Sequence, residues 1–133
     1  MQGHWKVLLV DDEEDFAAAL AERLRLRGIT VDTAYDGETA LQKVASYAPQ
    51  VVVLDVMMPG IGGLAVLQRI KAQRPATEVI LLTGKGSTRD GIEGMRLGAY
   101  DYLIKPVQID ELIVKMKEAV ASARPDGAEQ VKE

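Results

Sequence analysis

Short apolar runs alternate with longer amphipathic stretches along the chain. The apolar runs are rich in Val, Ile and Leu, which is typical of buried β-strands. They predict five strands, at residues 7–10, 29–35, 51–55, 78–84 and 100–104. The third run is uniformly apolar and mostly β-branched, so we expect it to form a central strand that is covered on both faces.

The stretches between the predicted strands carry apolar residues at helical spacing. In the first of them, Phe16, Leu20 and Leu24 recur every four residues on one helical face, and Gly28 then ends the pattern. Five helices are predicted, within residues 15–28, 36–49, 64–75, 87–99 and 109–123. The fourth is the weakest because it contains three glycines, each of which costs about 1 kcal/mol relative to alanine inside a helix.

Five strand–helix repeats of this kind predict an α/β fold, in which helices cover both faces of a parallel sheet. Right-handed crossovers place the carboxyl end of every strand at the same edge of that sheet. We expect a five-stranded, flavodoxin-like sheet with the strand order 2-1-3-4-5. Ligands of such sheets bind at the carboxyl edge, near the point where the strand order reverses.

Charged and polar side chains stand where four of the five predicted strands end. These side chains are Asp11 and Asp12 after the first strand, Asp55 on the third, Thr83 on the fourth and Lys105 after the fifth. Each alone has an ordinary explanation, since an aspartate can start a turn and threonine suits strands. Because the predicted fold makes the strand ends neighbours, we expect these side chains to share one site.

The acidic run after the first strand concentrates negative charge at one point. Glu13, Glu14 and Asp15 have a structural explanation, because acidic residues stabilise the positive end of a helix. Asp11 and Asp12 are explained less well in this way. Two carboxylates about 4 Å apart repel by about 4 kcal/mol at an effective dielectric constant of about 20, so the pocket needs a cation or a proton. Oxygen ligands without Cys or His favour Mg²⁺ over Ca²⁺ or Mn²⁺.

This set of groups suits phosphoryl transfer, in which positioning and charge neutralisation supply most of the catalysis. A carboxylate can be the nucleophile and form an aspartyl phosphate. A divalent ion and an ammonium group can offset the charge on the transferred group, and a hydroxyl group can donate a hydrogen bond to one of its oxygens.

Four segments, taken in order, resemble the receiver domains of bacterial two-component response regulators. They are LLVDDEED, VVVLDVMMPGIGG, VILLTGKGS and GAYDYLIKPV. The resemblance covers residues 6–123, which predicts a receiver domain at residues 1–123 and a polar tail or linker stump at residues 124–133. It implies a phosphorylation-activated signalling module that is not an enzyme, apart from catalysing its own phosphorylation and dephosphorylation.

The resemblance also implies a role for each residue of the phosphoacceptor site. Asp55 would accept a phosphoryl group from the phosphohistidine of a sensor histidine kinase or a phosphotransfer protein. Mg²⁺ would be held by Asp12, Asp55 and the backbone carbonyl of Met57, with Asp11 acting mainly through metal-bound water.

Further residues are implied to stabilise the phosphoryl group and to report its presence. Thr83 would donate its hydroxyl to the phosphoryl group, and Lys105 would pair with another phosphoryl oxygen. Tyr102 matches the aromatic residue that turns inward when Thr83 moves, and the peptide bond before Pro106 is expected to be cis. A downstream effector would bind the face formed by the last two predicted helices and the strand between them, and a homodimer is a further expectation for this class.

Composition narrows the range of functions. The 133 residues suit one domain, and the lack of cysteine excludes disulfides and thiolate metal sites. A net charge of −4 and a pI of about 5.1 argue against direct nucleic-acid binding by this domain. The sequence shows neither a signal peptide nor an apolar run that could cross a bilayer, so we expect a cytoplasmic protein without membrane contact.

Three alternatives stay open at this point. An aspartate-nucleophile phosphatase would carry a second aspartate two residues after the nucleophile, where this chain has Met57. A flavin or nucleotide carrier would bind phosphate after the first strand, where the acidic run would repel it. The chain is also compatible with a receiver fragment of a longer DNA-binding regulator or of a hybrid kinase.

Overall fold

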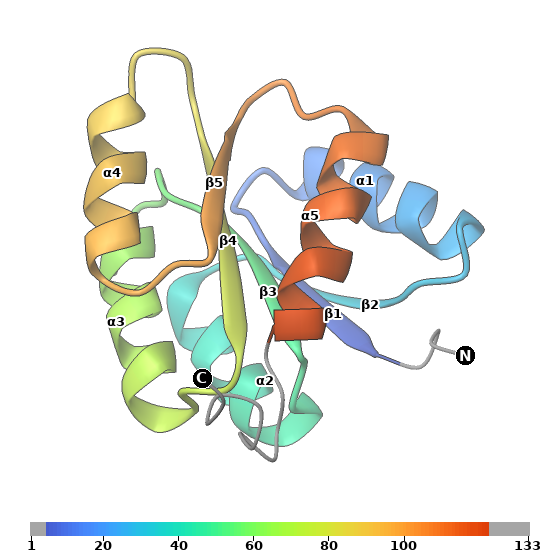
Figure 1. The fold of residues 1–133 in the computed structure, drawn as a ribbon, viewed down its shortest axis with the longest axis horizontal. Helices are drawn as coiled ribbons and strands as arrows, with labels where there is room; N and C mark the ends of the chain where they lie inside the picture. The colour runs from blue at the N-terminus through green and yellow to red at the C-terminus, as the bar shows by residue number, and fades with distance from the viewer. Residues whose placement is uncertain (1–4, 123–133) are drawn as a thin grey trace.

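A five-stranded parallel sheet forms the centre of the protein, in the strand order β2-β1-β3-β4-β5 (Figure 1). The computed structural model describes residues 5–122. Its strands are β1 (Lys6–Val10), β2 (Thr30–Ala34), β3 (Val51–Asp55), β4 (Glu78–Thr83) and β5 (Asp101–Ile104). The predicted fold class and strand order are therefore confirmed.

Helices cover both faces of the sheet, as the alternating sequence pattern predicts. They are α1 (Glu14–Leu26), α2 (Gly37–Tyr47), α3 (Gly63–Gln73), α4 (Thr88–Arg96) and α5 (Ile109–Ser122). Helices α1 and α5 pack on one face, and α2, α3 and α4 lie on the other (Figure 1). The expected tail at residues 124–133 lies outside the described residues. None of the helices within residues 5–122 is long and apolar enough to cross a membrane.

The core consists of two apolar layers, one on each side of the sheet. Successive side chains of a strand point to opposite faces, so Val7 and Leu9 of β1 enter one layer and Leu8 and Val10 enter the other. Every residue of β3 is buried, which explains why its sequence is continuously apolar up to its last position. That last position is Asp55, so the most buried strand delivers a carboxylate to the carboxyl edge of the sheet.

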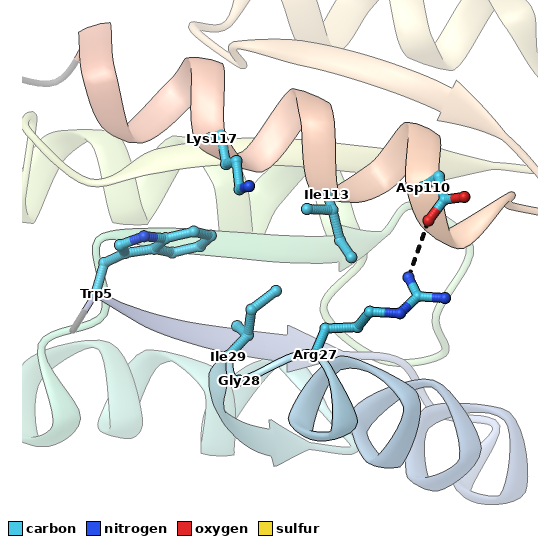
Figure 2. A pocket seen from close by; sticks show the side chains of 7 residues that line it. All are labelled: Trp5, Arg27, Gly28, Ile29, Asp110, Ile113 and Lys117. Atoms are coloured by element: carbon cyan, nitrogen blue, oxygen red, sulfur yellow. Dashed lines mark hydrogen bonds and ion pairs between the residues drawn. The ribbon is translucent and has the colours of Figure 1, made fainter. Parts of the chain in front are cut away.

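A cavity of about 400 Å³ lies between α5 and the chain that joins α1 to β2 (Figure 2). The indole of Trp5 and the side chain of Ile113 line it, and an ion pair of 2.9 Å between Arg27 and Asp110 stands at its other end. None of the side chains predicted for the functional site lines this cavity. We therefore assign it no part in the chemistry described below.

Candidate functional site

Three carboxylates meet beyond the carboxyl ends of β1 and β3. One oxygen atom from each of Asp11, Asp12 and Asp55 lies within 4.8 Å of the others. The two strands are neighbours, with Val10 paired to Leu54, so the residues that follow these positions come together. Asp11 is fully buried, Asp55 is 4% exposed, and Asp12 is the most exposed of the three. The structure thus assembles the acidic cluster that the strand ends predict.

Hydrogen bonds fix Asp11 at the start of this cluster. Its backbone N–H donates to the carbonyl of Ala34 at 3.1 Å, which continues the pairing of β1 with β2. Its carboxylate accepts the backbone N–H of Glu13 at 2.9 Å. Glu13 precedes α1 and makes no capping bond with its own side chain, while Glu14 and Asp15 fall in the first helical turn as the dipole argument predicts. Asp11 therefore orients the start of α1 as well as contributing charge.

The ammonium of Lys105 lies against the carboxylates. Its Nζ atom is 3.0 Å from Oδ2 of Asp11, 3.4 Å from Oδ1 of Asp55 and 3.7 Å from Oε1 of Glu13. The backbone N–H of Lys105 donates to the carbonyl of Thr83 at 2.7 Å, so the end of β4 positions the lysine. The peptide bond that follows Lys105 is cis, as expected. A residue far along the chain thereby supplies the positive charge next to the aspartates.

Burial and charge together set the ionisation of this cluster. Burial raises the pKa of Asp55, the Asp11 carboxylate raises it further, and Lys105 opposes both, which leaves the pKa of Asp55 at about 6. Burial lowers the pKa of the Lys105 ammonium, but its hydrogen bond to Asp11 and the nearby carboxylates outweigh this and raise that pKa. The Glu13 carboxylate is 68% exposed and therefore screened by water. Among the three aspartates, one ammonium leaves two negative charges uncompensated when all are ionised.

The donor set fits a hard divalent cation. Asp11, Asp12 and Asp55 each offer a carboxylate oxygen to the same point, and oxygen ligands of this kind suit Mg²⁺ and Ca²⁺. One divalent ion would also match the two uncompensated charges. A cavity of about 230 Å³ opens from this point, and Met57 and Lys105 line it together with two of the aspartates. Met57 thus lies at the cavity that Asp12 and Asp55 also line.

Two predicted residues lie near the site without lining its cavity. Thr83 ends β4 and is fully buried, and its hydroxyl donates to the carbonyl of Leu103 at 3.5 Å; the next residue, Gly84, lines the cavity instead. Tyr102 lies within β5, and its ring packs beneath α4 against Gly91. The structure therefore places the three carboxylates and Lys105 in one group. Thr83 lies beside this group, and the Tyr102 ring lies under α4.

Gly63 is a residue of this site that strand-end reasoning does not single out. A Cβ atom added there would lie 2.5 Å from the carbonyl oxygen of Asp55 and 2.7 Å from Cα of Val56. The first turn of α3 therefore packs directly against the backbone that carries Asp55. The glycine-rich loop before α3 is the only signal of this in the sequence, and it does not reveal which of its glycines is required.

A family comparison fits this geometry. A family model described as the response regulator receiver domain matches residues 7–117, which is most of the chain. The chain belongs to the response regulator receiver domain family. A receiver domain of this kind is a signalling module of two-component systems rather than a classical enzyme, which decides against the phosphatase and the flavin-carrier alternatives. The acidic cluster is consistent with a phosphoacceptor site.

Individual relatives agree with the family assignment. Transcriptional regulatory protein TcrA of Mycobacterium tuberculosis is 44% identical over 112 residues, which cover 84% of this chain and 44% of TcrA. Response regulator ArlR of Staphylococcus aureus is 37% identical over 112 residues, which cover 84% of this chain and 51% of ArlR. The chain thus spans about half the length of these curated relatives.

A solved receiver domain shares the fold of this chain. The receiver domain of NtrX from Brucella abortus superposes with a TM-score of 0.83 at 36% sequence identity. The superposition covers 87% of this chain and 98% of the NtrX domain. The described fold therefore matches nearly all of that solved receiver domain.

Proposed function

We propose that Asp55 is the phosphoacceptor, and that a sensor histidine kinase or a phosphotransfer protein supplies the phosphoryl group from a phosphohistidine. The observation that carries this proposal is the convergence of Asp55 with two further carboxylates and the Lys105 ammonium at one cavity. With a pKa of about 6, the Asp55 carboxyl group is mostly ionised at neutral pH and can act as a nucleophile.

The transfer step balances as a simple displacement at phosphorus. A carboxylate oxygen of Asp55 forms a bond to phosphorus while the bond between phosphorus and the donor's imidazole nitrogen breaks. The electron pair of the broken bond returns to that nitrogen, and the imidazole leaves neutral because its other nitrogen carries a proton. Lys105 already lies 3.4 Å from Asp55, so its ammonium can pair with a phosphoryl oxygen, and the Thr83 hydroxyl would donate to another.

We propose Mg²⁺ as the divalent ion of this site. Asp12, Asp55 and the Met57 carbonyl would hold it directly, and Asp11 would act mainly through metal-bound water. When bound, the ion would neutralise charge on the carboxylates and on the transferred group. Support comes from the all-oxygen donor set and from the two negative charges that Lys105 leaves uncompensated.

The partner surface that we propose is the face formed by α4, β5 and α5. Four large apolar side chains on these elements are 41–55% exposed, namely Ile92, Met95, Ile104 and Val114. Phosphorylation adds nearly two negative charges and strong acceptor oxygens, and Thr83 and Tyr102 would pass that change from the site to this face. A downstream effector would bind there, and a second copy of the chain is a further candidate.

We propose residues 1–123 as the receiver unit and residues 124–133 as a polar tail or linker. The unit would work in the cytoplasm, with no direct contact to nucleic acid or membrane. TcrA is named as a transcriptional regulatory protein and is about twice as long as the matched segment, which favours the reading of this receiver as part of a longer regulator.

The test of the phosphoacceptor is labelling with acetyl phosphate. Intact-mass spectrometry of the protein incubated with acetyl phosphate and Mg²⁺ should show one added phosphoryl group per chain, and hydroxylamine should remove it, as it does from an acyl phosphate. Asp55→Asn should take up no label. Asp32→Asn serves as the matched control, because Asp32 lies on the edge strand β2 and pairs with Lys43 of α2. This variant should label normally. Normal labelling of Asp55→Asn would overturn the assignment.

A further inference from the structure

Phe16 places an aromatic ring beside the lysine of the candidate site. The Nζ atom of Lys105 lies 4.7 Å from the centroid of the Phe16 ring, within the range of a cation–π interaction. Phe16 stands in the first turn of α1, and its ring also packs against the core layer between α1, α5 and the sheet. The ammonium is thus held by the Asp11 and Asp55 carboxylates and by a partly buried ring that packs against the core.

We propose that Phe16 is a positioning residue for phosphoryl transfer, which acts by holding the Lys105 ammonium beside Asp55. This inference rests on the proposed function. A lysine side chain is a flexible four-carbon stem that loses conformational entropy when it is fixed. The side chain of Lys105 is 22% exposed, so one side of it still faces water. The ring lies against the ammonium and reduces the number of positions that it can occupy.

The ring differs from the other groups around Lys105 in having no charge. Asp11 and Asp55, which now bind the ammonium at 3.0 and 3.4 Å, are also the groups proposed to hold a metal ion and to accept the phosphoryl group. A bound metal ion or phosphoryl group would therefore compete with Lys105 for these two carboxylates. Phe16 takes part in neither role, so its attraction for the ammonium persists when a phosphoryl oxygen becomes the new partner of Lys105.

The kinetic test uses three variants with acetyl phosphate at saturating Mg²⁺. Phe16→Leu keeps an apolar side chain but removes the ring, and it should lower the phosphorylation rate constant about threefold to tenfold, or about 0.7–1.4 kcal/mol. Phe16→Tyr keeps the ring face and should restore the rate. Trp5→Leu is the matched control, because Trp5 packs against the same core layer but lines the separate cavity in Figure 2. It should phosphorylate at the wild-type rate.

A spectroscopic test needs neither metal nor phosphate. Protons over the face of an aromatic ring resonate upfield, so the side-chain methylene signals nearest the Lys105 ammonium should be shifted upfield in metal-free protein. Lys105→Arg identifies those signals by their loss from a lysine-labelled sample. The upfield shift should disappear in Phe16→Leu and remain in Phe16→Tyr, and the Mg²⁺ affinity measured by calorimetry should be the same in both.

The outcomes separate this inference from the phosphoacceptor proposal. A wild-type rate in Phe16→Leu, with no label on Asp55→Asn, would overturn the role of Phe16 alone. An equal loss of rate in Phe16→Tyr and Phe16→Leu would also overturn it, because the ring face would then not matter. If Phe16→Leu did not fold, an unshifted Lys105 methylene signal in the wild type would still decide against it. Absence of label on the wild-type protein would instead remove the proposed function.

Discussion

The raised pKa of Asp55 predicts that the ionised carboxylate weakens the metal-free fold. Burial and the Asp11 carboxylate raise the pKa of Asp55 from 3.8 to about 6. Between these values the folded protein keeps a proton that the unfolded chain has released, so the free energy of unfolding falls as the pH rises from about 4 to about 6. Above pH 6 the free energy of unfolding is lowered by the full amount, and below pH 4 it is not lowered because Asp55 is protonated in both states.

The size of this effect follows from the same pKa. A rise from 3.8 to about 6 corresponds to about 3 kcal/mol, and water that enters the open side of the cavity reduces it to roughly 1–2 kcal/mol. Asp55→Asn should therefore stabilise the metal-free protein by roughly 1–2 kcal/mol at pH 7.5 and by almost nothing at pH 4. The change removes one of three mutually repelling charges and leaves Lys105 bonded to Asp11.

Urea unfolding at several pH values in the presence of a chelator measures this difference. Asp101→Asn is the control, because Asp101 stands outside the acidic cluster and pairs with Lys115 at 2.8 Å, so its loss should give no stabilisation. Adding Mg²⁺ should then stabilise the wild type more than Asp55→Asn, since the wild type keeps the full set of oxygen ligands. If Asp55→Asn were no more stable than the wild type at pH 7.5 in chelator, the electrostatic reasoning would be refuted.

Three further substitutions test the packing around the site and one surface ion pair. Gly63→Ala should lower the free energy of unfolding by about 1–3 kcal/mol in urea and slow labelling, because the new Cβ would lie 2.5 Å from the Asp55 carbonyl oxygen. Gly91→Ala should displace the Tyr102 ring and so shift its NMR signals, because the new Cβ would lie 2.5 Å from that ring. It should raise the free energy of unfolding by less than the usual value of about 1 kcal/mol for replacing a helical glycine with alanine. Asp110→Asn should change the free energy of unfolding by less than about 1 kcal/mol, because its ion-pair carboxylate is 88% exposed.

The meeting of the carboxylates could be predicted from the sequence because sheet topology brings the ends of their two strands together. Parallel strands with right-handed crossovers must end at one edge, and the strand order makes β3 the neighbour of both β1 and β4. The side chains at the ends of β1 and β3 are then close to each other, whereas Lys105 follows β5, two strands from β3, and reaches the carboxylates with its long side chain. The proximity of Asp11 and Asp55 therefore does not depend on a particular rotamer, whereas the position of the Lys105 ammonium does.

The contacts of Phe16 and Gly63 could not be predicted in the same way. They depend on how closely α1 and α3 dock on the sheet, and the whole core determines that distance. The glycines of α4 show the same limit. By intrinsic propensity these glycines destabilise the helix. In the structure, however, Gly91 lies against the ring of Tyr102 and Gly94 lies against the side chain of Leu81. Their small size lets α4 approach the sheet, so part of that cost is offset by packing.

The charge balance of the acidic cluster links the stability of this fold to its proposed chemistry. Asp55 must be ionised at neutral pH to act as a nucleophile, yet burial and Asp11 both oppose its ionisation. Lys105 offsets one negative charge, and more ammonium groups would remove the attraction for a divalent cation. The cluster therefore destabilises the metal-free fold. A bound cation relieves the same repulsion, and this relief contributes to the free energy of binding. Stability and cation affinity are thus two measures of one electrostatic quantity, and a substitution that relieves the repulsion must weaken the binding.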